Sequence, residues 1–513
     1  MTKLYKTKSV CTSGVLMNKK YDFIEGSITP TFFYHSIPVI FSMLFAASVS
    51  IVDGWFVGKY IGPDGLAAIN IVMPILNLLW GLNIMLVVGS TVSIGKQLGA
   101  EKYEMANYIF SKTIIGVAAA NIGFAVLALF FEKEILVYLG ATPEIMQMAS
   151  DYYFYVVLFT LFYGINLTIS YFIRLEGRTA FVATGLILFV LGNIFLDWLF
   201  IGFLGWGMKG AAYATSFAEL FSTLFLLSHY FNPCCVLKFS FKLKRWRRLM
   251  RSCYNGVSEF ITESAVGVVL MLFNISLIKY IGLDGVVAFT IINYFLLVQY
   301  TTVTAIGDSM QPVLAINYGR KKWERINAFI CHAFKFSFVV GALASLILYF
   351  YAEQISNFFV DETNATVHQI IREFAKVFWI TFLLNGITVN ISTYFTATSR
   401  PRNAAIVSFS GGIIFPIISI KLLPLFFGAA GIYWALPFSQ SVSFLLACGL
   451  FYYDTHYGEA DEGLHPQKHR QPAVVPDSDV TPEMTPQPDV VLNEALLRAP
   501  AMMKMKKNAA MPD

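Results

Sequence analysis

The stretch Tyr60-Ile61-Gly62-Pro63-Asp64-Gly65-Leu66-Ala67-Ala68 returns later in the chain as Tyr280-Ile281-Gly282-Leu283-Asp284-Gly285-Val286-Val287-Ala288. The same offset of 220 residues maps Gly99 onto Gly319 without a gap. The chain is therefore a duplication. Two similar halves that face one another are a common architecture among membrane proteins that move solutes.

The composition is that of a membrane protein. Hydrophobic residues make up 56% of the 513 residues and charged residues only 13%. The apolar residues come in runs of about 20 or more, the length that a helix needs to cross a bilayer. We predict an all-α integral membrane protein with twelve transmembrane helices in two pseudo-symmetric lobes of six. The predicted spans are 32–58, 66–94, 104–131, 146–172, 179–204, 210–231, 253–279, 286–316, 325–351, 367–396, 402–427 and 429–453.

These spans divide the chain into five parts. They are a cytoplasmic N-terminal segment (1–31), an N-lobe (32–232), a basic cytoplasmic linker (233–252), a C-lobe (253–453) and a cytoplasmic tail (454–513). Prolines recur among acidic and small residues in the tail, which is typical of disorder. We assign the tail no activity.

The basic residues set the orientation. Lys and Arg gather in the segments on the side of the N-terminus, so the positive-inside bias predicts that both termini are cytoplasmic. The run Lys242–Arg248 would attract anionic lipid headgroups rather than nucleic acid. The six cysteines fall in cytoplasmic or membrane positions and favour free thiols. We expect a multi-pass protein of the plasma membrane, monomeric, with a small-molecule substrate and without a nucleic-acid partner, metal or cofactor.

Acids inside the spans are the candidate functional residues. A charge at the bilayer centre costs roughly 2.5 to 3.5 kcal/mol on insertion scales, so a retained acid points to function. The acids that lie away from the span ends are Asp53, Asp197, Glu219, Glu259, Glu263 and Asp308.

Asp53 and Asp197 are predicted to lie at one depth in the outer half of the N-lobe. Each lies six or seven residues before the outer end of an outward-running span, and Asn193 shares the face of Asp197 because it is one helical turn away. Protonation of one carboxyl depends on a close neighbour, so this cluster can hold H⁺ or a small cation. The alternative is that each Asp only joins neighbouring helices through hydrogen bonds.

The repeat gives an internal control for this interpretation. Phe273 is the counterpart of Asp53, and an apolar residue near Ile418 is the counterpart of Asp197. The C-lobe thus keeps the scaffold without these acids. If the acids only held helices together, the second copy would need them too, so the asymmetry indicates ion chemistry in the N-lobe.

The other acids leave two interpretations open. Glu259 and Glu263 are spaced i,i+4 near a cytoplasmic end, where they either reach interfacial water or form a second ion or substrate contact. Glu219 and Asp308 either line a polar cavity or satisfy a neighbouring helix. Pro38 lies fifteen residues before Asp53 and can kink the first span, either as a static bend or as a joint that responds to Asp53.

The chain resembles the multidrug and toxic compound extrusion family of secondary transporters over about residues 30–455. The motifs are Ile51-Val52-Asp53-Gly54-Trp55-Phe56-Val57-Gly58, Gly192-Asn193-Ile194-Phe195-Leu196-Asp197, Lys209-Gly210-Ala211-Ala212-Tyr213-Ala214-Thr215 and Met310-Gln311-Pro312. The resemblance implies two six-helix lobes around a cavity and export of amphipathic, often cationic compounds driven by H⁺ or Na⁺. It also implies that Asp53, Asn193 and Asp197 form the coupling cluster and that Pro38 is the kink of span 1. Glu259 and Glu263 do not match the acidic position that some branches use in span 7.

Other function classes fit less well. A flippase for a lipid-linked substrate is the alternative, but it would need several Lys or Arg inside the spans to bind phosphate. A membrane-embedded enzyme needs a metal motif or a paired nucleophile and base, and the seven histidines are scattered. No G-x-x-x-x-G-K-[ST] loop occurs, which argues against a nucleotide-driven pump. A passive channel remains a further alternative.

Overall fold

The computed structural model describes residues 21–233, 235–240, 247–359 and 364–458. Of these, the residues up to Phe451 form one compact unit, and residues 452–458 fall outside it. The first unit carries both halves of the repeat. The predicted tail lies outside the described residues except for its first five positions.

The described residues are predominantly helical and contain no strand, which confirms the predicted all-α class. The first half contains α3 (Ile28–Ala47), α4 (Val49–Tyr60), α5 (Pro63–Gly99), α6 (Tyr103–Phe130), α7 (Glu132–Tyr138), α8 (Met146–Leu158), α9 (Thr160–Leu175), α10 (Thr179–Asp197), the π-helical turn Trp198–Phe203, α11 (Gly207–Leu227) and a short 3₁₀ turn (Ser228–Phe231). The second half contains α12 (Arg247–Tyr280), α13 (Leu283–Gly319), α14 (Trp323–Phe359), α15 (Ala365–Ala397), α16 (Pro401–Phe409), the π-helical turn Ser410–Ile414, α17 (Phe415–Phe427) and α18 (Ala429–Tyr453).

The number of spans agrees with the prediction. Within the described ranges, 11 helices are long and apolar enough to cross a membrane, and α8 with α9 makes a twelfth span that is bent by 46°. The helices extend beyond two predicted domain boundaries. The first span begins at Ile28, inside the predicted N-terminal segment, and α12 begins at Arg247, inside the predicted linker.

The repeated stretch that opens the sequence analysis builds one turn twice. Gly62 and Gly282 both have a left-handed backbone, with φ of 105° and 98°, immediately before α5 and α13. A residue with a Cβ adopts this conformation at a cost, so glycine is favoured in both copies. The duplicated sequence therefore encodes the turn that joins the first two spans of each half.

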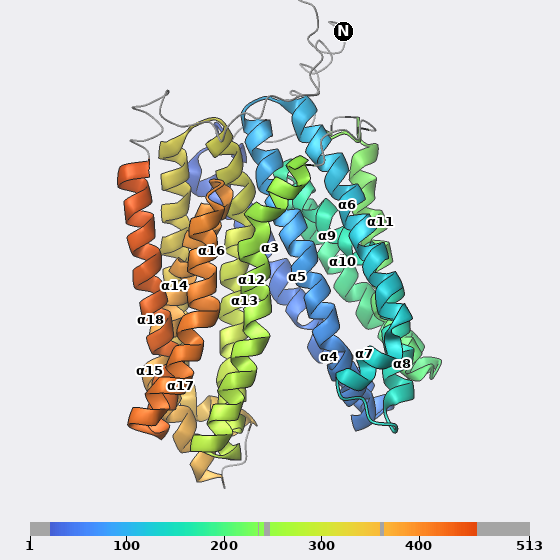
Figure 1. Cartoon of the computed structure of the whole chain (residues 1–513), viewed down its shortest axis with the longest axis vertical. Coiled ribbons are helices and arrows are strands. Elements are labelled where there is room, and N and C mark those ends of the chain that lie inside the picture. The colour runs from blue at the N-terminus through green and yellow to red at the C-terminus, as the bar shows by residue number, and fades with distance from the viewer. Residues whose placement is uncertain (1–20, 234, 241–246, 360–363, 459–513) are drawn as a thin grey trace, which may run out of the picture. The chain divides into compact units, whose positions relative to one another are not determined.

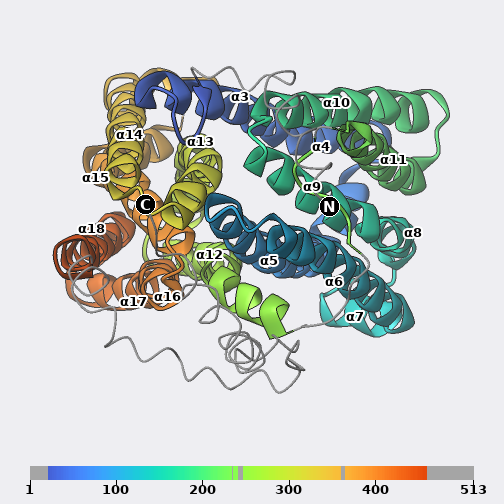
Figure 2. The same cartoon turned by 90° about the horizontal axis from the view of Figure 1, so that it is seen from above.

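The two halves form two lobes, with α4–α11 in one and α12–α18 in the other (Figure 1). The first span of each half lies against the opposite half. Helix α3 packs on α13 and α14, and α12 packs on α5, as the view along the helices also shows (Figure 2). Helices α3 and α4 both pack on α10, and the contact of α4 with α10 places the two candidate N-lobe acids, Asp53 and Asp197, on neighbouring helices.

The lobes meet at the end of the molecule that carries Lys102, Arg178 and Arg320, which we call the basic end. The hydrophobic core is divided accordingly. One cluster of buried residues draws on both halves, including Val39 of α3, Ile94 of α5 and Leu314 of α13. Toward the opposite end the N-lobe and the C-lobe have separate clusters. The lobes thus share a core at the basic end and bury their apolar side chains independently at the other, where their ribbons diverge in Figure 1.

Glycines allow the close approach at the basic end. A Cβ on Gly99 would lie 2.1 Å from the Ile316 carbonyl oxygen, and a Cβ on Gly319 would lie 2.3 Å from the Lys96 carbonyl oxygen. The two contacts are related by the 220-residue repeat, so they form a pseudo-twofold pair. Similarly, a Cβ on Gly256 of α12 would lie 2.0 Å from the Met85 carbonyl oxygen of α5.

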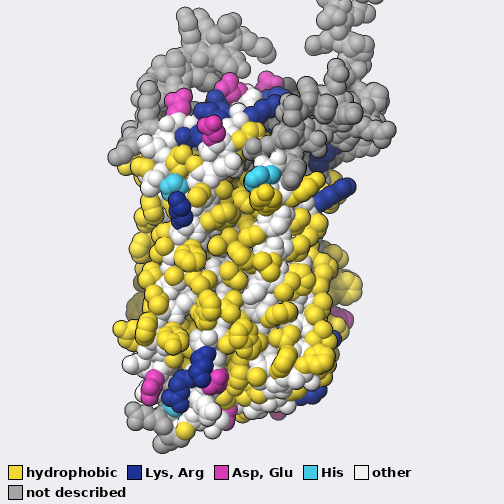
Figure 3. Space-filling model, turned by 90° about the vertical axis from the view of Figure 1, so that its left-hand side faces the viewer, with side chains coloured by type: hydrophobic (Ala, Val, Ile, Leu, Met, Phe, Trp, Pro, Cys, Tyr) yellow, Lys and Arg dark blue, Asp and Glu magenta, His cyan; other side chains and the backbone are white. Residues whose placement is uncertain are grey.

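On the face drawn in Figure 3, a wide belt of hydrophobic side chains lies between two ends that carry charged side chains. Aromatic residues in both halves are strongly exposed, among them Phe41, Phe130 and Phe426, with 69%, 78% and 77% of each residue exposed. Contiguous exposed apolar surface of this extent is expected where lipid, rather than water, surrounds the protein.

Candidate functional site: an acid cluster and two cavities

The predicted N-lobe cluster is assembled in the structure. Asp53 lies on α4, five residues after the break between α3 and α4 at Ser48, and Asp197 is the last residue of α10. The two carboxyl groups interact directly with each other. Asn193, one turn before Asp197, donates a hydrogen bond from Nδ2 to Thr215 Oγ1 on α11 at 3.4 Å. Asn193 and Asp197 are buried, with 0% and 1% of each residue exposed.

This cluster has more acceptors than donors. Asp53 Oδ1, Asn193 Oδ1 and Asp197 Oδ2 are buried and have no hydrogen-bond partner. Buried polar atoms without a partner are rare and costly, so each requires an explanation. Three oxygen acceptors in one place suit a proton or a small hard cation such as Na⁺, both of which oxygen ligands hold. The residues present therefore fit the coupling ion that the sequence suggests.

Asp53 opens onto a cavity of about 440 Å³ in the N-lobe. Its wall combines carboxyl groups with aromatic rings. The residues that matter for its chemistry are Asp53, Glu219, Trp80, Tyr152, Phe159 and Tyr163. Tyr152 lies within electrostatic range of both Asp53 and Asp197, and the Trp80 and Tyr163 rings lie 5.2 Å apart. Tyr152 and Thr215 were not predicted as site residues, because neither is ionised inside a span and only packing brings them to the acids.

The C-lobe has a second cavity, of about 510 Å³. Its wall is mainly apolar and includes Phe273, Phe289 and Leu297. Three acids reach it, Glu259 and Glu263 from α12 and Asp308 from α13. Glu263 also lines the N-lobe cavity and interacts with the Trp80 indole. The two cavities therefore meet at Glu263.

The structure distinguishes between the interpretations left open for the remaining acids. Glu219 lines the N-lobe cavity, and Glu259 lines the C-lobe cavity while accepting a hydrogen bond from Thr396 Oγ1 at 3.5 Å. Glu263 lines the C-lobe cavity as well, so the structure places both acids of α12 where the sequence also allowed an ion or substrate contact. For Asp308 the sequence allowed either a position in the wall of a cavity or a bond to a neighbouring helix, and the structure shows both.

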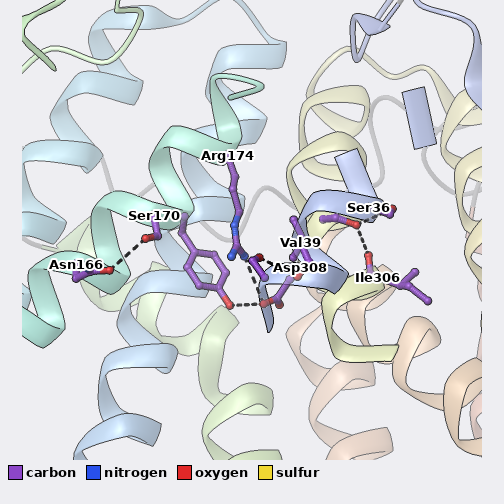
Figure 4. A network of polar contacts seen from close by, with 10 residues as sticks. Ser36, Val39, Asn166, Ser170, Arg174, Ile306 and Asp308 are labelled. Carbon is purple, nitrogen blue, oxygen red and sulfur yellow. Dashed lines mark hydrogen bonds and ion pairs between the residues drawn. The ribbon is translucent and has the colours of Figure 1, made fainter. Parts of the chain in front are cut away.

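Asp308 binds two residues of the N-lobe. Tyr171 Oη donates a hydrogen bond to Asp308 Oδ2 at 3.0 Å, and Arg174 Nη1 lies 3.5 Å from the same oxygen. Figure 4 shows Arg174 and Asp308 pointing toward one another from their two helices. In the sequence Arg174 is only one of many basic residues near span ends. Its pairing could not be predicted because Arg174 and Asp308 are 134 residues apart.

The second copy of the repeat fills the equivalent positions with apolar side chains. Phe273, the counterpart of Asp53, is fully buried and its ring lies 4.5 Å from that of Phe289. Ile418, near the counterpart of Asp197, is 45% exposed. The acid pair is therefore particular to the N-lobe.

Pro38 lies inside α3, which continues through it, and the interruption of the first span falls at Ser48. Ser48 Oγ donates to the Phe45 carbonyl at 2.6 Å next to this break. The role of Pro38 as a joint stays a prediction. Asp197 is followed directly by the π-helical turn Trp198–Phe203, a feature that often accompanies functional sites.

Glu176, His229 and Cys235 form a group whose side-chain types could bind a metal, with ligand atoms within 4.8 Å of one another. Other contacts account for this group. His229 Nε2 lies 2.6 Å from Glu176 Oε2, and the Leu237 N–H donates to Glu176 Oε1 at 2.7 Å. Arg178 Nη1, a cationic donor, lies 3.5 Å from His229 Nδ1. These contacts hold the segment after α11 to the end of α9.

The chain is similar to known transporters along most of its length. A family model described as MatE matches residues 38–199 and 258–420. Multidrug export protein MepA of Staphylococcus aureus is 24% identical over 440 residues, which cover 84% of this chain and 95% of that protein. The protein of the same name from Staphylococcus haemolyticus is 26% identical over 435 residues, covering 84% and 94%.

Solved structures share the fold. A structure described as the outward-facing conformation of a multidrug resistance MATE family transporter superposes with a TM-score of 0.79 at 18% identity, over 86% of this chain and 99% of that one. The Vibrio cholerae MATE transporter VcmN in the bent form gives a TM-score of 0.78 at 20% identity, over 84% and 98%. At these identities the likeness concerns the fold alone.

Proposed function

Because the chain belongs to the MatE family of multidrug efflux transporters, we propose that it exports amphipathic organic cations across the plasma membrane in exchange for H⁺ or Na⁺. The protein is a multi-pass membrane transporter and not an enzyme. The proposed cycle is alternating access, in which the substrate path opens to one side of the membrane at a time. The proposed topology places the basic end and both termini in the cytoplasm.

The observation that carries the proposal is the buried pair Asp53 and Asp197 with its unpaired acceptor oxygens. An antiporter needs a site that holds its driving ion and changes when the ion leaves. Two adjacent carboxyls beside a cavity meet this need, because their mutual repulsion is relieved by a proton or a cation and returns when it departs. The cavity gives water and the ion access to Asp53.

The walls of both cavities favour cationic cargo. Carboxyl groups and aromatic rings line them, and aromatic faces attract organic cations. Among the described residues, neither wall includes a Lys or Arg. A lipid-linked phosphate would need such residues, and the relatives found are export proteins, so a flippase has no support here.

The shared core at the basic end supports alternating access in outline. Each lobe has its own core toward the opposite end, so the lobes can separate there without exposing that core. For the cavity to open at the basic end instead, the close contacts at Gly99, Gly256 and Gly319 must separate.

The test is efflux of a fluorescent organic cation from proteoliposomes, with a proton gradient and a sodium gradient imposed separately. We expect efflux to follow one of the gradients in the wild type and to be lost in Asp53→Asn, because an amide cannot release a proton and binds Na⁺ weakly. Asp64→Asn is the matched control, since it makes the same change at an exposed acid of the neighbouring turn.

Full gradient-driven efflux by the Asp53→Asn variant would remove the N-lobe cluster from the mechanism. Absence of efflux under either gradient, with the protein folded and inserted, would overturn the proposed cargo class. Efflux of a lipid substrate without ion dependence would then bring the flippase back.

A further inference from the structure

A contact between the lobes involves an acid of the substrate cavity. Asp308 lines the C-lobe cavity, yet its carboxyl is held by Tyr171 and Arg174, which belong to α9 of the N-lobe. The next residue, Ser309, is hydrogen-bonded through Oγ to Ser36 Oγ of α3 at 2.8 Å. Figure 4 shows both contacts in one layer between the lobes. The state of Asp308 therefore affects the cavity and the lobe interface together.

The pair is buried but loosely made. The side chains of Arg174 and Asp308 are 5% and 15% exposed, and the 3.5 Å between Nη1 and Oδ2 is longer than the roughly 2.7–2.9 Å of a strong charge-assisted hydrogen bond. Arg174 Nε is buried and has no partner. A buried ion pair offsets its desolvation only when its geometry is good and all its donors are satisfied. A competing cation can thus displace Arg174 more easily than it could break a tight bidentate pair.

The surroundings of Asp308 favour such a competitor. Glu259 and Glu263 of α12 both interact electrostatically with Asp308 and line the same cavity. From α9 the facing groups are Arg174 and the neutral Tyr171. Arg174 is the one cation that interacts with Asp308 among the described residues, so three acids are balanced by one base. A cation that enters the cavity finds uncompensated negative charge at Asp308.

Resting on the proposed function, we propose that Asp308 is a shared acceptor for which Arg174 and the cationic group of the substrate compete. In the state with the basic end closed, Asp308 holds Arg174. A cation that binds Asp308 from the cytoplasm excludes Arg174 and favours the state in which the lobes are parted at the basic end. When that end closes, Arg174 returns to Asp308 and displaces the cation toward the opposite side, which is the direction of export. Neutral compounds of the same shape do not release the contact.

The experiment is hydrogen–deuterium exchange, read by mass spectrometry, on the full chain in lipid nanodiscs. The reporters are the interface segments 91–99 of α5 and 309–319 of α13, which are protected when the basic end is closed. We expect tetraphenylphosphonium to raise deuterium uptake in both segments of the wild type. The neutral triphenylphosphine oxide should leave uptake unchanged.

Variants separate the contact from substrate binding. In Arg174→Gln we expect raised uptake without any ligand and no further rise with tetraphenylphosphonium. Arg174→Lys should keep the wild-type response. The exchange of charges, Arg174→Asp with Asp308→Arg, should restore protection and lose the response, because the cavity then presents a cation. Glu101→Gln is the matched control, since it breaks an exposed pair with Arg320 (2.9 Å) at the same end and should leave the response intact.

Two results would overturn the inference. One is binding of tetraphenylphosphonium, measured by equilibrium binding, without a change in uptake. The other is wild-type protection in Arg174→Gln, with the variant confirmed as folded by its thermal melting. Failure of the proposed function has a different signature, in which tetraphenylphosphonium neither binds nor is exported by the wild type. The variant with exchanged charges is measured by deuterium uptake and by efflux. If it is folded and regains protection, the contact between positions 174 and 308 is supported even when efflux is lost.

Discussion

At the residue scale, the feature that sets this chain apart is a group of acids with few partners. Asp53 and Asp197 face each other with unpaired oxygens, and Asn193 beside them has an unpaired oxygen as well. The second copy of the repeat places Phe273 at the position of Asp53 and buries it completely. The acids are therefore not needed to build a lobe, and the ion binding that we propose would explain why their oxygens lack donors.

We predict that Asp197→Asn loses exchange as completely as Asp53→Asn. Either substitution leaves a single carboxyl, so the repulsion between two carboxylates, which a bound ion would relieve, is gone. Thr215→Val should only weaken exchange, since it removes the acceptor of the Asn193 amide at a cost of about 1 to 3 kcal/mol and leaves both acids in place. Proteoliposome efflux gives the activities, and thermal melting reports the stabilities. Equal activity of Asp197→Asn and the wild type would contradict the paired site.

At the element scale, helix interruptions and glycines decide where the lobes touch. The first span breaks at Ser48, α8 and α9 meet at a bend, and α10 passes into a π-helical turn directly after Asp197. The long helices α5, α12 and α13 cross closely because Gly99, Gly256 and Gly319 face backbone carbonyls. A side chain at these positions would have to displace the main chain of the other lobe, which cannot move as a flexible side chain does.

We predict that Gly256→Ala prevents full closure of the basic end, because its Cβ would lie 2.0 Å from the Met85 carbonyl oxygen. Gly267→Ala on the same helix is the matched control, since nothing lies within 4 Å of its Cβ. Alanine there should leave stability unchanged or raise it by up to about 1 kcal/mol through its better helix propensity. Deuterium uptake of residues 91–99 should rise in the first variant only, and equal uptake in both variants would refute the steric argument.

At the scale of the whole first unit, the two cavities described above and the three largest clusters of buried residues determine which parts of the lobes can separate. The cavities meet at Glu263, whose carboxyl lies within electrostatic range of Tyr163 together with Glu219 of the N-lobe. The cores are separate toward one end and shared at the basic end. A substrate between the lobes would thus meet acids from both halves, and in our proposal its charge acts on Asp308, which also holds the lobes together through Tyr171 and Arg174.

We predict that Glu263→Gln raises KM for a cationic substrate on the order of tenfold, which corresponds to about 1.4 kcal/mol of lost binding. The maximal rate and the dependence on the ion gradient should persist, because the N-lobe cluster is intact. KM for a neutral substrate, if one is transported, should not change. Glu259→Gln should impair coupling less than Asp53→Asn, and a loss as deep as that of Asp53→Asn would move the coupling site to α12.

The amino-acid sequence by itself determined the membrane class, the duplication, the twelve spans and the candidate acids. These follow from local properties, namely the length of apolar runs, the repeat of one turn and the cost of a charge in lipid. Only the tertiary structure decided that Glu259 and Glu263 face cavities, that the first span breaks at Ser48, and that Arg174 meets Asp308. Contacts of this kind join helices that are far apart in the chain, and side-chain packing between the lobes, which no local pattern encodes, sets them.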